Sequence, residues 1–147
     1  MLTDHLDPRT ADAATVERLS IAFNRCFETF EAQDAIADDV FCDLYPPFWR
    51  FQLQGRDALT TQLRTIAHGA TTVRVLRVVP TATGFVMEHE ETEGGDNGEI
   101  ARRLWLCDVR DGRITNVLGY CNGGWDPALR ARHAAEAPML RPWETDR

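Results

Sequence analysis

The sequence lacks any hydrophobic run close to the roughly 20 residues that a membrane-spanning helix needs. It also lacks an excess of positive charge, because 16 basic side chains face 23 acidic ones and the formal net charge is -7. This balance disfavours a surface that binds nucleic acid or an anionic membrane. The first residues, MLTDHLDPRTADAA, are polar and acidic, unlike a secretory signal. We therefore expect a cytoplasmic protein with no nucleic-acid partner and no membrane partner.

Cysteine is scarce and shows no metal-binding pattern. Cys26, Cys42, Cys107 and Cys121 form no CxxC pair and have no histidine-rich neighbour. The pattern predicts reduced, mostly buried thiols, no metal site and no cofactor. The sequence shows no internal repeat and no low-complexity segment. Its 147 residues, 44% of them apolar, are enough for one domain with one hydrophobic core.

The chain contains a helical part followed by consecutive strands. Asp12 is the expected N-cap of a long helix to about Gln33, and apolar residues at three- and four-residue spacing predict that this helix packs on a sheet. The expected elements are a loose arm over 1–11, helices over 12–33, 34–39, 56–68 and 126–137, strands over 40–45, 48–54 and 71–79, a strand meander over 84–125, and a polar tail. This order predicts an α+β fold with a curved antiparallel sheet wrapped around the long N-terminal helix, and a pocket at one end.

The meander contains the most informative pattern. Turn residues at 94–98 and at Asp111-Gly112 divide it into three strands. We assume that Glu93 pairs with Glu99 and Arg110 with Arg113, and strand alternation then sorts the side chains onto two faces. One face is apolar at one end and polar at the other, as expected of a cavity wall. This face carries Phe85, Met87, His89, Glu91, Arg103, Trp105, Cys107, Val109, Ile114, Asn116, Leu118, Tyr120 and Asn122.

The polar end of this face, together with one aspartate from an earlier strand, suggests general acid–base chemistry. The predicted catalytic residues are Asp43, His89, Arg103, Tyr120 and Asn122. Asp43 can act as a base if an aromatic wall desolvates it and raises its pKa, whereas His89 titrates near neutrality unaided. Arg103 and Tyr120 can stabilise a developing enolate or alkoxide, and Asn122 can hold a carbonyl oxygen. The predicted substrate-binding residues are Tyr45, Trp49, Phe51, Met87, Glu91, Trp105, Leu118 and Trp125, which suit a small apolar organic substrate.

Four of the predicted catalytic residues also have a structural alternative. His89 can pair with Glu91 or Glu88, and Arg103 can form a cross-strand ion pair with a glutamate. Tyr120 can belong to the core, and Asp43 can cap a turn before Pro46-Pro47. We expect Arg102 to pair with Glu90. Three glutamates are expected on a solvated or dimer-facing edge, and three histidines on the surface. These are Glu88, Glu90 and Glu93, and His5, His68 and His133.

Three segments, ADDVFCD, QGRDAL and VRDGRITNVLGY, resemble the nuclear-transport-factor-two-like (NTF2-like) superfamily, in particular its SnoaL-like branch of small cyclases, isomerases and hydratases. The resemblance implies a cone-shaped single domain over 1–147, with a core over about 13–125, and a homodimer formed through the outer sheet face. In ketosteroid-isomerase-like members the base position matches Asp43 with a one-residue gap, but the first helix here has no tyrosine. In SnoaL-like cyclases the acid–base aspartate matches Asn122, an amide.

Three functions fit these observations. The first is a cofactor-free enzyme of bacterial secondary metabolism that isomerises, cyclises or dehydrates a small apolar metabolite, such as a polyketide, by general acid–base chemistry. The second is a non-catalytic ligand-binding or accessory dimer module, which the missing helix-one tyrosine and the amide at Asn122 favour. The third is an epoxide hydrolase, which needs an Asp/Arg/Asp relay; Asp43 and Arg103 supply two parts, and the sequence offers no convincing second aspartate.

Overall fold

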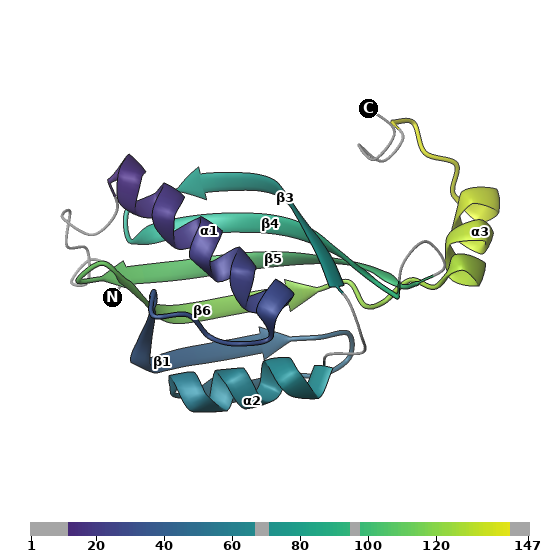
Figure 1. Cartoon of the computed structure of the whole chain (residues 1–147). Helices are drawn as coiled ribbons and strands as arrows, with labels where there is room; N and C mark the ends of the chain where they lie inside the picture. Colours follow the sequence, from purple (N-terminus) through teal and green to yellow (C-terminus); the bar gives the residue numbers. More distant parts are fainter. Residues whose placement is uncertain (1–11, 67–70, 95–97, 142–147) are drawn as a thin grey trace.

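The computed structural model describes residues 12–66, 71–94 and 98–141 (Figure 1). The predictions for the arm over 1–11, for His5 and His68, and for the end of the polar tail lie outside the described residues. Within them, α1 (Ala13–Thr29) begins at the predicted N-cap, where the Asp12 side chain accepts a hydrogen bond of 2.7 Å from the Thr15 N–H. The helix ends before Gln33 because Phe30 adopts a left-handed conformation with φ 58°.

Six strands form one sheet in the order β2-β1-β6-β5-β4-β3. Their bounds are β1 (Ile36–Tyr45), β2 (Phe51–Gln54), β3 (Thr71–Pro80), β4 (Gly84–Glu93), β5 (Ile100–Arg110) and β6 (Arg113–Cys121). The predicted α+β fold with a curved sheet is confirmed, although β1 and β6 pair in parallel rather than antiparallel. Helix α1 lies across one face of the sheet, and α2 (Arg56–Ile66) runs beside β1 (Figure 1).

The apolar stripe of α1 packs on the sheet as predicted. Val16, Leu19, Phe23, Cys26 and Phe27 are all buried. They meet buried residues of four of the strands, β1, β4, β5 and β6, so that most of the core lies between α1 and the concave face of the sheet. The third helix, α3 (Pro127–Glu136), begins with Asp126 as N-cap and a proline in the first turn, as predicted, but buries none of its residues. Among the described residues no helix is both long and apolar enough to cross a membrane.

Two predictions about the segment before α2 were wrong. The short helix over 34–39 is instead a turn followed by the start of β1, where Ile36 and Val40 are fully buried. The N–H of Ile114 donates to the Ala35 carbonyl at 2.8 Å, so that β6 pairs with this segment. The predicted strand from Phe48 begins only at Phe51, since Phe48 has a φ of 63° and lies in the loop.

The assumed register of the meander is right for its first half and wrong for part of its second half. Glu93 pairs with Glu99 through a backbone hydrogen bond of 3.0 Å, and β4 and β5 keep this register. Arg110 pairs with Arg113 as predicted, but the register of β5 and β6 shifts by one between Asp108 and Val109. Thr115 is the extra residue of this β-bulge. Beyond it, every side chain of β6 lies on the opposite face from the predicted one.

Candidate functional site

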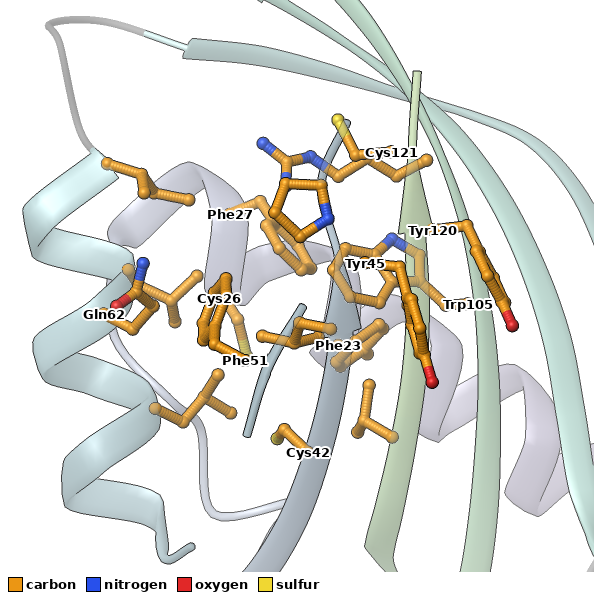
Figure 2. A pocket seen from close by; sticks show the side chains of 18 of the residues that line it. Phe23, Cys26, Phe27, Cys42, Tyr45, Phe51, Gln62, Trp105, Tyr120 and Cys121 are labelled. Carbon is orange, nitrogen blue, oxygen red and sulfur yellow. The ribbon is translucent and has the colours of Figure 1, made fainter. Parts of the chain in front are cut away.

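A cavity of about 380 Å³ lies between α1, α2, β1 and the concave face of the sheet (Figure 2). Helices α1 and α2 supply one side of it, and β1, β5 and β6 supply the other. The residues that line it are Phe23, Cys26, Phe27, Cys42, Leu44, Tyr45, Pro46, Pro47, Phe51, Leu59, Gln62, Leu63, Ile66, Arg103, Trp105, Val117, Gly119, Tyr120, Cys121 and Gly123. Most of these side chains are aromatic or aliphatic, as in most small-molecule sites.

Trp105 forms a central part of the cavity wall because β6 carries a glycine beside it. A Cβ atom on Gly119 would lie 2.3 Å and 2.6 Å from two carbons of the Trp105 ring. With no side chain at this position, the indole lies across β6 and packs against two rings of α1. The ring centroid of Trp105 is 5.3 Å from that of Phe23 and 5.0 Å from that of Phe27.

Arg103 is the one formally charged side chain among the described residues that line the cavity. Its Nη2 atom lies 3.0 Å from Oε2 of Glu91, whose side chain is 3% exposed. Its Nε atom is buried and has no hydrogen-bond partner in the described part of the chain. Arg103 also lines a second, smaller cavity of about 160 Å³, together with Glu91, so the guanidinium lies where the two cavities meet.

His89 lies behind this ion pair and is fully buried. Its Nε2 atom is 3.0 Å from Oε1 of Glu91 and 3.3 Å from Nε1 of Trp105. Burial lowers the pKa of His89 more than the neighbouring carboxylate raises it, which favours the neutral imidazole. Burial raises the pKa of Glu91, but the hydrogen bond from His89 and the charge of Arg103 outweigh it and leave this pKa lowered. The group therefore contains one carboxylate, one guanidinium and a neutral imidazole.

Comparison with protein-family models and with curated proteins gave no match. Solved structures do match. An NTF2-like protein of unknown function from Mesorhizobium loti is 20% identical with a TM-score of 0.62, over 78% of this chain and 99% of that chain. A proposed ketosteroid isomerase from Kribbella flavida is 17% identical with a TM-score of 0.63, over 91% and 95%. An LEH-like epoxide hydrolase from M. tuberculosis is 21% identical with a TM-score of 0.61, over 90% and 100%.

The chain has an NTF2-like fold. At these identities the likeness concerns the fold, and function depends on the side chains that the NTF2-like fold brings together.

Of the predicted catalytic residues, Asp43 lies on the outer face of this NTF2-like sheet. Its neighbours Cys42 and Leu44 line the cavity, so alternation along β1 directs Asp43 away from it. Both carboxylate oxygens accept hydrogen bonds from Arg50, at 2.9 Å and 2.7 Å. These hydrogen bonds lower the pKa of Asp43. The predicted desolvation by an aromatic wall, and a relay in which Asp43 meets Arg103, are therefore both contradicted by the geometry.

Tyr120 and Asn122 also lie apart from the predicted group, because the bulge at Thr115 reverses their side of the sheet. Tyr120 is 45% exposed, and its ring stacks on that of Tyr45 with 4.9 Å between centroids at the edge of the cavity. Asn122 is exposed, and its Oδ1 accepts a hydrogen bond of 2.8 Å from the Arg102 N–H. Neither side chain joins His89 and Arg103.

The predicted substrate-binding residues divide into two groups. Tyr45, Phe51 and Trp105 line the cavity, and Glu91 lines the smaller cavity beside it. The other four lie elsewhere: Met87 is buried in the core, Leu118 is on the outer face, Trp49 is 71% exposed in the β1–β2 loop, and Trp125 packs against the half-buried His133.

Two contacts offered as structural alternatives are present in the NTF2-like sheet. His89 contacts Glu91, and Arg103 forms a cross-strand ion pair with the same carboxylate. The expected pair of Arg102 with Glu90 is also present, with 3.4 Å between Arg102 Nε and Glu90 Oε2. Glu90 was expected on a solvated edge but is only 4% exposed.

The helices contribute side chains to the cavity that were not among the predicted site residues. Phe23 and Phe27 belong to the apolar stripe of the first helix, which predicted only packing on a sheet, and Gln62 was not a predicted site residue, although all three line the cavity. Gln62 could have been found, because it follows Leu59 by three residues and so shares the buried side of α2 while carrying an amide.

Proposed function

We propose that this protein binds a small, mostly apolar molecule in the cavity between α1, α2 and the sheet, in the cytoplasm. The observation that carries the proposal is the cavity itself, about 380 Å³ in volume and lined mainly by aromatic and aliphatic side chains. Apolar concave sites with a few polar groups are the usual form of small-molecule sites. The four cysteines are free, in keeping with a reducing compartment.

The neutral fluorescent probe N-phenyl-1-naphthylamine tests this proposal. We expect a saturable rise in its fluorescence, with about one probe bound per chain. Replacing Leu44 by Trp fills the cavity from β1 and should weaken probe binding by about tenfold or more, a loss of about 1.4 kcal/mol. Phe41→Trp is the matched control, since Phe41 belongs to the same strand but faces outward. A fluorescence rise that does not saturate, or that Leu44→Trp leaves unchanged, would contradict the proposal.

A cofactor-free enzyme is the second candidate function. The chain of contacts from His89 through Glu91 to Arg103 supports it, because this chain joins a carboxylate base to a cation at the edge of the cavity. Glu91 takes the role first predicted for Asp43: its lowered pKa keeps it ionised, and it removes a proton next to the carbonyl of a substrate that reaches the smaller cavity, while Arg103 stabilises the enolate oxygen. Isomerisation, cyclisation or dehydration of a secondary metabolite can start from such an enolate.

Exchange of the methyl protons of 2-acetylnaphthalene for deuterium, followed by NMR in D₂O, tests the second candidate. We expect the protein to accelerate exchange and Glu91→Gln to abolish the acceleration while the fluorescent probe still binds. Exchange at the rate in buffer alone would remove the enzyme proposal and leave the binding proposal intact.

We also propose that two copies of the chain pair through the outer face of the sheet. Leu104 and Leu106 are each 40% exposed there. Beside them, alternating charges form a ladder across three strands, in which Arg74 and Arg102 contact Glu90 and Arg77 and Arg102 contact Glu88. Light scattering should give twice the mass of the chain, and Leu106→Glu should reduce it to that of one chain. A single-chain mass for the wild type would contradict this proposal.

A further inference from the structure

We propose that the cavity selects an uncharged ligand whose hydrogen-bond-accepting oxygen, such as a carbonyl oxygen, meets the free Nε–H of Arg103, and that it disfavours a carboxylate of the same shape. This inference rests on the proposed binding function and names the class of ligand. It follows from one unsatisfied donor and from the distribution of charge around it.

The unsatisfied donor is the first observation. Arg103 contacts Glu91 through Nη2, whereas its Nε is buried and has no hydrogen-bond partner within the described residues. A buried donor without a partner is costly, and a hydrogen bond to a charged group contributes more than one between neutral groups. Arg103 lines the cavity, so a bound molecule that displaces the atoms covering Nε can place an acceptor oxygen against this donor.

The charge around Arg103 is the second observation. Glu91 already balances the guanidinium at 3.0 Å. The smaller cavity beside Arg103 is lined by three glutamates, Glu91, Glu93 and Glu99, and by no other basic residue among those described. On the β6 side the neighbouring residue is Cys121, and His89 is neutral behind Glu91. A carboxylate entering the cavity would lose its hydration without meeting an excess of positive charge, whereas a carbonyl oxygen loses much less.

Basic side chains can make only non-covalent contacts with a carbonyl ligand in this cavity. All 16 basic residues of the chain are arginines, so no lysine is present to form a Schiff base with an aldehyde or ketone. Gln62, on the α2 side, adds an uncharged polar group that can orient a second polar atom of the ligand. The recognition is therefore expected to be reversible and to depend on Arg103.

Three probes with one ring system separate the possibilities: 2-acetylnaphthalene has an acceptor, 2-ethylnaphthalene has none, and 2-naphthoate carries a negative charge. Isothermal titration calorimetry on the wild-type chain should give the tightest binding for the ketone, by about tenfold over the hydrocarbon. The carboxylate should bind more weakly than the hydrocarbon. Equal affinities, or tightest binding of 2-naphthoate, would overturn the inference.

Variants of Arg103 test whether its guanidinium causes the preference for the ketone over the hydrocarbon. Arg103→Lys keeps a cation beside Glu91 but removes Nε–H, so the ketone should bind no better than the hydrocarbon. Arg102→Lys is the matched control, because it alters the adjacent residue on the outer face and should preserve the preference. If Arg103→Lys does not fold, the double variant Arg103→Met/Glu91→Leu removes both charges together and should show the same loss.

The outcomes also separate this inference from the proposed function. Saturable binding of N-phenyl-1-naphthylamine without a ketone preference overturns the inference and leaves the binding function standing. Failure of all four probes to bind removes both.

Discussion

At the scale of single residues, the position of a side chain along its strand decides whether it meets the cavity. Cys42 and Leu44 line the cavity, and Asp43 between them pairs with Arg50 on the other face. In the same way Arg103 lines the cavity while Arg102 contacts glutamates on the outer face. A polar residue in a strand is therefore a candidate for the site only if its nearest neighbours are outward-facing.

Gly119 offers a prediction at this scale. We expect Gly119→Val to lower the free energy of unfolding by about 1–3 kcal/mol, because its side chain collides with the Trp105 ring. Urea unfolding measures the change. Trp105→Leu removes the colliding ring, so the double variant should lose less stability than the sum of the two single losses. Strict additivity would show that the two side chains do not meet.

At the scale of elements, a single extra residue determines which side chains of β6 reach the cavity. The bulge at Thr115 keeps Val117 buried at 3% exposure and leaves Asn116 and Tyr120 exposed.

The β1–β2 loop contains one residue with a strained backbone. It contains Phe48, which adopts a φ of 63° and is fully exposed. A non-glycine residue in this left-handed region is strained, and here no buried contact offsets the strain.

Phe48→Gly should therefore raise the free energy of unfolding by about 0.5–1 kcal/mol. Glycine adopts positive φ without steric cost, and the fully exposed phenyl ring contributes no burial that the substitution would remove. Thermal unfolding of the purified variant measures the effect. Trp49→Gly is the control, because Trp49 is not among the residues with positive φ and should gain no stability. Lower stability for Phe48→Gly would show that the exposed ring makes stabilising contacts.

At the scale of the whole molecule, the buried side chains of His89 and Glu91 make the free energy of unfolding depend on pH. The pKa of His89 is lowered by burial, so the unfolded chain binds a proton at a higher pH than the folded chain does. The contribution of His89 to the free energy of unfolding is lost as the pH falls below the ordinary histidine pKa of about 6.5. The pKa of Glu91 is also lowered, so its contribution is lost as the pH falls below about 4.5.

We therefore expect the urea midpoint to fall between pH 7 and pH 5, before ordinary carboxylates titrate. His89→Leu should flatten the pH dependence in this window, even if it lowers stability at pH 7 by leaving Glu91 with one fewer partner. His133→Leu alters a half-buried histidine on α3 and should leave the dependence in place. An unchanged slope in His89→Leu would show that His89 is not the group responsible.

Local sequence patterns determined most of the elements. The Asp12 cap and the apolar stripe predicted α1 and its buried face, and the turn at Asp111-Gly112 together with β-branched and apolar runs predicted the strands that follow. These features depend on neighbours within a few residues, so a single chain suffices to recognise them. The cross-strand pairs of Arg102 and Arg103 with glutamates were also within reach, since the register of β4 and β5 follows from one short turn.

Only the tertiary structure decided which polar residues form the site. The register shift at Thr115 keeps Val117 buried in the core, and the local sequence of β6 does not indicate where this shift occurs. The parallel pairing of β1 with β6, far apart in the chain, likewise directs Cys42 rather than Asp43 to the cavity. Because side chains alternate with a period of two residues, such a one-residue difference moved Tyr120 and Asn122 away from Arg103 and left Glu91 as its partner.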